Sequence, residues 1–336
     1  MIERNPDEYL FADAFIGCQQ AKLMNWQDLV RLANLGDFDA AQTALLEFGY
    51  GDPTETKQEG DVEEFIRREQ AWLYEMIFRN MTGREEMAPY LFPFDYHNLK
   101  ACLKSEILGK TPDEKLLIST GEIDWMTVVA MVRDRNYASM RPTMREAVQE
   151  ATDLYGRTQD PQVIDLVLDM ACYKDLVLGA EETGSEFILE MVRTRIDTLN
   201  LKSFARIRKI NKGWAFFKNA MLPEGYLKEE FFLANFEDSM SQLADKINQP
   251  YIKAAVAEGG RILEETGKFT RYEKLLDDAV MEVNKKAKFY TEGIEPIAGY
   301  WFAKETELDN LRIILNGLLI HSEPDQIIEF LREPYV

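Results

Sequence analysis

The chain has 336 residues, of which 39 are basic and 59 acidic, so its formal net charge is −20. Hydrophobic residues make up 46% of it, too many for a disordered acidic chain, and the length predicts two or three structural units. A surface this negative disfavours nucleic acid as a partner, because it repels phosphate groups.

The three cysteines, Cys18, Cys102 and Cys172, lie far apart and form no C-x-x-C pair, which is typical of reduced residues in a cytosolic protein. The N-terminal residues are acidic where a signal peptide needs a basic start and a continuous apolar stretch. No window reaches 18 uninterrupted apolar residues. We therefore expect a cytoplasmic protein with no signal peptide and no transmembrane segment, which can still dock on a membrane component.

Apolar residues recur with helical spacing along most of the chain. In residues 61–78 they follow one another mostly at steps of three and four, and residues 160–178 behave alike, with Pro161 at the expected first turn. Gly and Pro gather between such segments, and residues 51–60 are expected to form a loop. Because we find no convincing strand pattern with a hairpin turn, we predict an all-α fold.

One pattern, acidic-x-x-Asn-Leu-basic, occurs three times. Its copies are DYHNLKACLK from Asp95, DTLNLKSFAR from Asp197 and ELDNLRIILN from Glu307, at spacings of 102 and 110 residues. Chance can supply one such copy but hardly three, so the chain contains an internal repeat with a period near a hundred residues.

Further correspondences extend the repeat. LLISTGEIDW (116–125) follows the first copy at about the distance at which MLPEGYLKEE (221–230) follows the second, and Asn25-Trp26 opens a segment that resembles the one opened by Asp124-Trp125. We therefore predict three related helical units, with boundaries soft by about ten residues: residues 1–110, 111–213 and 214–336.

On a helical wheel, the acid of each copy falls on the apolar stripe and the Asn lies at the edge of that stripe. An unpaired carboxylate facing a core costs on the order of a few kcal/mol, so we expect each acid to hydrogen-bond a backbone end or a polar group on a neighbouring helix. A bond that sets helix register explains three diverged copies better than three ligand sites do. The residues concerned are Asp95, Asn98, Asp197, Asn200, Glu307 and Asn310.

Basic residues point to the other side of the same helices: Lys100, Lys104, Lys202, Arg206 and Arg312. Solvated helix surface is the simple interpretation. Against a net charge of −20, these positions are also candidate contacts for an acidic partner.

Segments that resemble catalytic motifs lack residues which those motifs require. Gly109-Lys110-Thr111 imitates the end of a phosphate-binding loop, but Lys104 stands where the pattern requires Gly, so a helix C-cap is the better interpretation. The two histidines, His97 and His321, stand in no metal-binding spacing.

Two further sequence features also have structural explanations. Asp277-Asp278 lacks the third Asp of a D-D-x-x-D diphosphate site, because Met281 stands there, and we interpret the pair as an exposed acidic turn of a helix. Gly259-Gly260 is interpreted as a helix break. We therefore expect no catalytic activity, no cofactor, no metal and no small-molecule substrate.

Three all-α repeats with this motif, the segments MLPEGYL and YWFAKETELDNLRIILNG, and the ending LREPYV together resemble the C subunit of the V-type and A-type rotary ATPases. Its eukaryotic counterpart is the d subunit. The resemblance covers essentially the whole chain and is most specific over residues 300–336. The third unit departs from it, since it lacks the Trp found at Trp26 and Trp125.

The resemblance implies a non-catalytic, funnel-shaped protein with pseudo-threefold symmetry. Such a protein would sit at the cytoplasmic end of the membrane rotor ring, which is built of proteolipid subunits, and receive the tip of the central stalk, formed by the D and F subunits. It would pass torque between the ATP-hydrolysing or ATP-synthesising head and the ion-transporting ring. The resemblance leaves open whether the ion is a proton or sodium, and whether the complex works as a pump or as a synthase.

The alternative is a helical-repeat scaffold of another complex that binds protein partners in a concave face. That interpretation predicts a period of about 34–47 residues, whereas the observed period is near a hundred.

Overall fold

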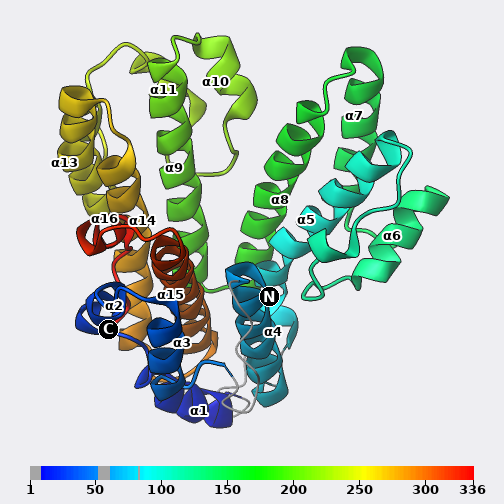
Figure 1. The fold of residues 1–336 in the computed structure, drawn as a ribbon. Helices are drawn as coiled ribbons and strands as arrows, with labels where there is room; N and C mark the ends of the chain where they lie inside the picture. Colours follow the sequence, from blue (N-terminus) through cyan, green and yellow to red (C-terminus); the bar gives the residue numbers. More distant parts are fainter. Residues whose placement is uncertain (1–8, 52–60, 82–83) are drawn as a thin grey trace. The chain divides into compact units, whose positions relative to one another are not determined.

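The computed structural model describes residues 9–51, 61–81 and 84–336, and these residues form helices and no strand (Figure 1). The predicted all-α class is thereby confirmed. The loop expected at residues 51–60 lies, except for its first residue, outside the described residues.

The chain divides into two compact units. The first unit is formed by residues 84–236, and the second by residues 9–81 together with 237–336. The finer division into three repeats stays a prediction.

The first unit contains the longer helices α5, α7, α8 and α9 and several short ones. Its elements are η2 (Arg84–Met87), α5 (Ala88–Ile107), η3 (Glu114–Leu116), α6 (Trp125–Asp134), α7 (Pro142–Thr158), α8 (Gln162–Thr183), α9 (Glu186–Lys209), α10 (Trp214–Ala220) and α11 (Glu229–Ala234). The helix predicted from residue 160 is α8, and it begins directly after Pro161.

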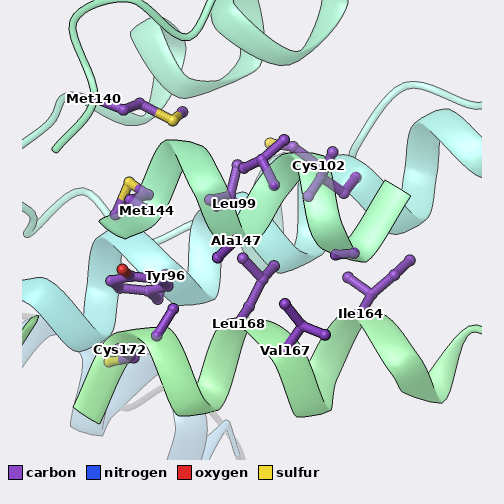
Figure 2. Packing of buried hydrophobic residues seen from close by; sticks show 14 of the residues in the cluster. Tyr96, Leu99, Cys102, Met140, Met144, Ala147, Ile164, Val167, Leu168 and Cys172 are labelled. Carbon is purple, nitrogen blue, oxygen red and sulfur yellow. The ribbon is translucent and has the colours of Figure 1, made fainter. Parts of the chain in front are cut away.

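The core of the first unit lies between α5, α7 and α8 (Figure 2). Leu99 of α5, Ala147 of α7 and Leu168 of α8 all belong to this core and are almost completely buried. Burial of one Leu side chain stabilises the folded state by about 1.5–3 kcal/mol. The buried apolar residues of these helices therefore hold them together.

The second unit joins the two ends of the chain. Its elements are α1 (Leu10–Gln20), α2 (Trp26–Ala33), α3 (Phe38–Glu47), α4 (Val62–Asn80), α12 (Met240–Asp245), α13 (Pro250–Thr266), α14 (Thr270–Asn284), η4 (Lys285–Phe289), α15 (Ile294–Leu319) and α16 (Pro324–Phe330). The N-terminal helices α1 to α4 all pack on α15. Leu29 and Leu32 of α2 share one apolar cluster with Leu311 and Leu315 of α15.

The two adjacent glycines of α13 do not break it. Gly259 and Gly260 lie inside a continuous helix, so the expected break is wrong. A Cβ on Gly259 would lie 2.7 Å from the Tyr272 Cα atom, and one on Gly260 would lie 2.6 Å from the Met240 Cβ atom. The missing side chains let α12 and α14 approach α13 closely, and this packing offsets the roughly 1 kcal/mol that each Gly costs in a helix.

Candidate functional site: three buried acid–asparagine motifs

The three copies of the repeated pattern lie on three long helices, α5, α9 and α15. We call the acid and the Asn of each copy an anchor motif. All six side chains are buried. The wheel placed each Asn at the edge of the apolar stripe, but the structure buries the Asn side chains as fully as the Asp side chains, because each helix is covered there by a returning loop.

Each Asn forms a pair of hydrogen bonds with one backbone residue, donating from Nδ2 to the carbonyl oxygen and accepting at Oδ1 from the N–H. The donor–acceptor distances are 2.9 and 2.8 Å for Asn98 with Ile118, 2.9 and 2.8 Å for Asn200 with Leu222, and 3.0 and 2.7 Å for Asn310 with Arg332. The bound residue follows its Asn by 20, 22 and 22 positions. Each amide thus satisfies both backbone polar groups of one residue in a segment that runs back over the helix.

The two aspartates bind the same loops a few residues later. Asp95 Oδ1 accepts from the Ile123 N–H at 3.0 Å, and Asp197 Oδ1 accepts from the Leu227 N–H at 3.0 Å. In both loops the bound residue directly precedes the N-cap of the next helix, α6 or α11. The acid therefore sets where that next helix begins.

The third anchor motif uses both ends of the chain. Asn310 binds Arg332 in the C-terminal tail, whereas Glu307 Oε2 accepts from the N–H of Met24, which is 283 residues earlier in the chain. Met24 directly precedes Asn25, the N-cap of α2. Residues 24–26 therefore take the place in the third copy that residues 123–125 take in the first. The resemblance of Asn25-Trp26 to Asp124-Trp125 was the signal for this.

Glycine is required beside the two aspartates. Gly121 and Gly225 each stand two residues before the backbone N–H that the aspartate binds, and a Cβ at either position would lie 2.3 Å from the carboxylate oxygen. The equivalent position before Met24 is Lys22, and the acid of that copy is the longer Glu307. Both loop sequences contain this Gly, but the reason for it is visible only in the structure, where the carboxylate fills the space that a side chain would need.

The two aspartates titrate far from their ordinary range. Burial raises the pKa of Asp95 and of Asp197 to about 7, although their backbone hydrogen bonds act in the opposite direction. The second carboxylate oxygen of each is buried and has no hydrogen-bond partner among the described residues. The nearest cation to that oxygen of Asp95 is Arg141, whose Nη2 atom lies 4.0 Å away.

Glu307 has a different environment. Its carboxylate accepts from the Lys304 ammonium at 2.8 Å and from the Tyr50 hydroxyl, and the Lys304 Nζ atom lies 4.0 Å from the Tyr50 ring centroid. Burial, with the Glu307 charge beside it, raises the pKa of Tyr50. A buried ion pair with its remaining lone pairs satisfied can be accommodated in a core, whereas a half-satisfied carboxylate is costly.

The basic candidates of the first and third copies form ion pairs within the chain. The pairs are Lys100 with Asp169 at 2.6 Å, Lys104 with Asp165 at 2.6 Å, and Arg312 with Glu63 at 3.1 Å and with Asp309 at 2.5 Å. The first two tie α5 to α8, an arrangement that the wheel of a single helix cannot reveal. Lys202 is half-buried and Arg206 is exposed, and both also interact within the chain. Their contact with a partner stays a prediction.

The segment Gly109-Lys110-Thr111, which resembles the end of a phosphate-binding loop, is the end of a helix. Gly109 has a φ of +63° and follows α5, and the Lys110 N–H donates to the Ser105 carbonyl at 2.9 Å. This is the hydrogen bond that closes a helix at a left-handed Gly, so the C-cap interpretation is confirmed.

The acidic pair on α14 is not an exposed turn, and that interpretation is wrong. Asp277 accepts from the Arg332 guanidinium at 2.9 Å, and Asp278 accepts from the Glu333 N–H at 2.7 Å. Both carboxylates hold the C-terminal tail, which a local pattern cannot show. Over the described ranges, no three His, Cys, Asp or Glu side chains are grouped so that they could hold a metal ion.

The chain matches the family model described as ATP synthase (C/AC39) subunit over residues 12–330, a range that includes all three anchor motifs. It is 24% identical to the C subunit of the A-type ATP synthase of Methanocaldococcus jannaschii, over 95% of this chain and 85% of that protein. It is 22% identical to the C subunit of the V-type sodium ATPase of Enterococcus hirae, over 82% and 83% of the two chains. It is also 22% identical to the C subunit of the A-type ATP synthase of Methanosphaera stadtmanae, over 96% and 86%. This chain therefore belongs to the ATP synthase (C/AC39) subunit family, the non-catalytic C subunits of A-type and V-type rotary ATPases.

Proposed function

We propose that this protein is the central-rotor component that couples the stalk of a rotary ATPase to its membrane rotor ring. In this role it binds the D and F subunits of the stalk on one side and the proteolipid ring on the other. It transmits torque between the ATP-driven head and the transport of protons or sodium ions.

The observation that carries the proposal is the threefold recurrence of one hydrogen-bonding arrangement, in a chain that belongs to this family along nearly its whole length. In each anchor motif the Asn ties a returning segment to a long helix through two hydrogen bonds. The acid binds the same loop in the first two copies and the N–H of Met24 in the third. A torque-transmitting adaptor must resist deformation, and the buried hydrogen-bond pair that each Asn forms contributes such stiffness. Three related helical units with pseudo-threefold symmetry, arranged as a funnel, are part of the same proposal.

The proposed location is the cytoplasmic face of the membrane, through the rotor ring. None of the helices described here is both long and apolar enough to cross a bilayer.

The test is purification of the tagged chain from membranes of its own host in mild detergent, with quantitative mass spectrometry of what accompanies it. We expect the stalk proteins and the ring protein in fixed ratio to the tagged chain. An untagged strain is the control. Recovery of the folded chain without either partner would contradict the proposal.

A further inference from the structure

The end of α9 and the turn into α10 have a charge opposite to that of the rest of the molecule. Residues 198–223 contain six basic residues and no acidic one, whereas about one residue in six of the whole chain is acidic. Five residues of this stretch form an exposed group that we call the basic tip: Arg206, Lys209, Ile210, Lys212 and Phe216.

The backbone of the basic tip is held by its own hydrogen bonds. Asn211 has a φ of +55°, and the Lys212 N–H donates to the Ile207 carbonyl at 3.1 Å, which closes α9 in a tight left-handed turn. A short connection through Gly213 then starts α10. The turn is therefore a defined shape and needs no ordering before it binds a partner.

A buried aromatic cluster fixes α10 beneath the tip. Phe217 is completely buried, and its ring centroid lies 5.1 Å from that of Phe204 and 5.1 Å from that of Phe232. The adjacent Phe216 is 51% exposed and Ile210 is 60% exposed. Because Phe217 packs inward, the adjacent Phe216 faces solvent, and Ile210 at the end of α9 is exposed as well.

The charge of the tip is only partly compensated within the chain. Lys218 is neutralised by Glu229 at 2.7 Å and does not count toward the tip. Lys209 and Lys212 have no ion pair with a described residue, and Lys212 instead lies 5.7 Å from the Phe216 ring centroid. The helix dipole explains basic residues in the last turn of α9, but it explains neither Lys212 beyond the helix nor the exposed Ile210 and Phe216.

We propose that the basic tip is a docking surface for an acidic segment of another protein of the rotary complex, an inference that rests on the proposed function. Carboxylates of the partner meet Lys209 and Lys212, while an apolar side chain of the partner packs against Ile210 and Phe216. Apolar anchors within a charged rim are the usual composition of a binding hot spot.

A protein segment fits the tip better than an anionic bilayer does. A planar anionic membrane would also face the acidic surface of a chain with a net charge of −20, whereas a narrow acidic segment meets the local positive field. That field extends about 8–10 Å at physiological ionic strength.

The first experiment compares two double charge reversals in the tagged full-length chain, each produced in a host that lacks the wild-type copy. The tip variant is Lys209→Glu/Lys212→Glu, and the control is Lys253→Glu/Lys268→Glu, two lysines of the second unit outside the tip. We expect the tip variant to recover at least about tenfold less of the stalk or ring proteins at low salt, with a smaller loss at about 300 mM salt. Its melting temperature should equal that of the control.

The outcomes separate this inference from the proposed function. If the wild type brings down no rotary protein, the proposed function fails. If the wild type brings them down and the two variants do so equally well or equally poorly, the assignment of the tip is overturned. Binding of the wild type to vesicles of phosphatidylcholine and phosphatidylserine, lost in the tip variant, would also overturn it in favour of a membrane contact.

A second experiment identifies the partner segment directly. A photo-crosslinking amino acid at position 216 should attach to a partner segment that contains at least two acidic residues. Phe216→Ser/Ile210→Ser should reduce recovery of the same partner without altering the salt dependence, because it removes only the apolar contact. Attachment to a segment without Asp or Glu would contradict the proposed chemistry.

Discussion

Gly225 shows how a missing side chain can matter as much as a charged one. The Asp197 carboxylate occupies the space beside Gly225 that a Cβ would need, at 2.3 Å. The same relation holds between Gly121 and Asp95. The glycine and the aspartate therefore act together. The carboxylate can approach the loop backbone because the glycine has no side chain in that space.

Changing Gly225 to Ala should destabilise the protein by about 1–3 kcal/mol, because either the loop or the carboxylate must move and the Leu227 hydrogen bond is weakened. The measurement is the free energy of unfolding in urea. Gly156→Ala is the matched control. Gly156 is an exposed residue of α7 with open space around its Cβ position, so the change should stabilise by up to about 1 kcal/mol. Equal effects of the two changes would refute the steric explanation.

The buried Asp197 should make stability depend on pH near neutrality. Its folded-state pKa is about 7, against an ordinary value of 3.8, so the folded chain binds more protons than the unfolded chain between these values. The resulting contribution is fully present below pH 3.8 and is lost as the pH rises through about 7.

Compared with Asp197→Asn, the wild type should therefore gain stability as the pH falls from 8 to 5, by at most about 1.4 kcal/mol per pH unit. Asn keeps an acceptor for the Leu227 N–H but cannot titrate. Urea unfolding of both proteins at several pH values measures the difference. Parallel stability curves would show that Asp197 has no raised pKa.

The anchor motif is also a unit at the scale of secondary structure, because it joins the middle of one helix to the start of the next. In the first copy the chain leaves α5, is held at Ile118 and Ile123, and enters α6 at a cap made by Asp124. The spacing between the two bonds and the cap therefore sets the length and path of the connection.

Asn200→Asp should cost about 2–4 kcal/mol and more than Asn200→Ala. The Asp has nearly the same shape, but it has no N–H for the Leu222 carbonyl and brings a charge into a site that is 1% exposed. Chemical denaturation measures both changes. Asn219→Asp, at an exposed position of α10, should change stability by less than about 0.5 kcal/mol. An Asp variant as stable as the Ala variant would argue against the donor role of the amide.

At the scale of the whole molecule, the second unit is closed by contacts between residues far apart in the chain. Its C-terminal tail is held by Lys274, which donates to the Leu331 carbonyl, by Asp278 and by Asn310. Its N-terminal segment is held by Glu307. The integrity of this unit therefore depends on both ends of the chain.

Removal of residues 331–336 should increase deuterium uptake in α14 and α15 while leaving uptake in α7 and α8 of the first unit unchanged. The tail satisfies buried polar groups of α14 and α15, and the core of the first unit makes no use of it. Hydrogen exchange followed by mass spectrometry tests this. Increased uptake throughout the first unit would show that the two units open together.

The sequence by itself determined the helical class, the family and the three copies of the motif, with its acids on the apolar stripe. Helical periodicity and a short repeated pattern depend on neighbours three or four positions apart, and the burial of the acids follows from their place on the apolar stripe. Predictions from neighbouring residues alone were wrong at two places. The role of Gly259-Gly260 depends on Tyr272 and Met240, and the role of Asp277-Asp278 depends on the C-terminal tail.

Only the tertiary structure decided what each motif binds. Asn98 and Asn200 bind loops about twenty residues ahead, while Glu307 binds Met24 at the other end of the chain. It also decided that Lys100 and Lys104 are paired with α8. The physical reason is that a hydrogen bond or ion pair depends on which segment returns over a helix. The packing of several elements sets that path, and the pattern of any single element does not.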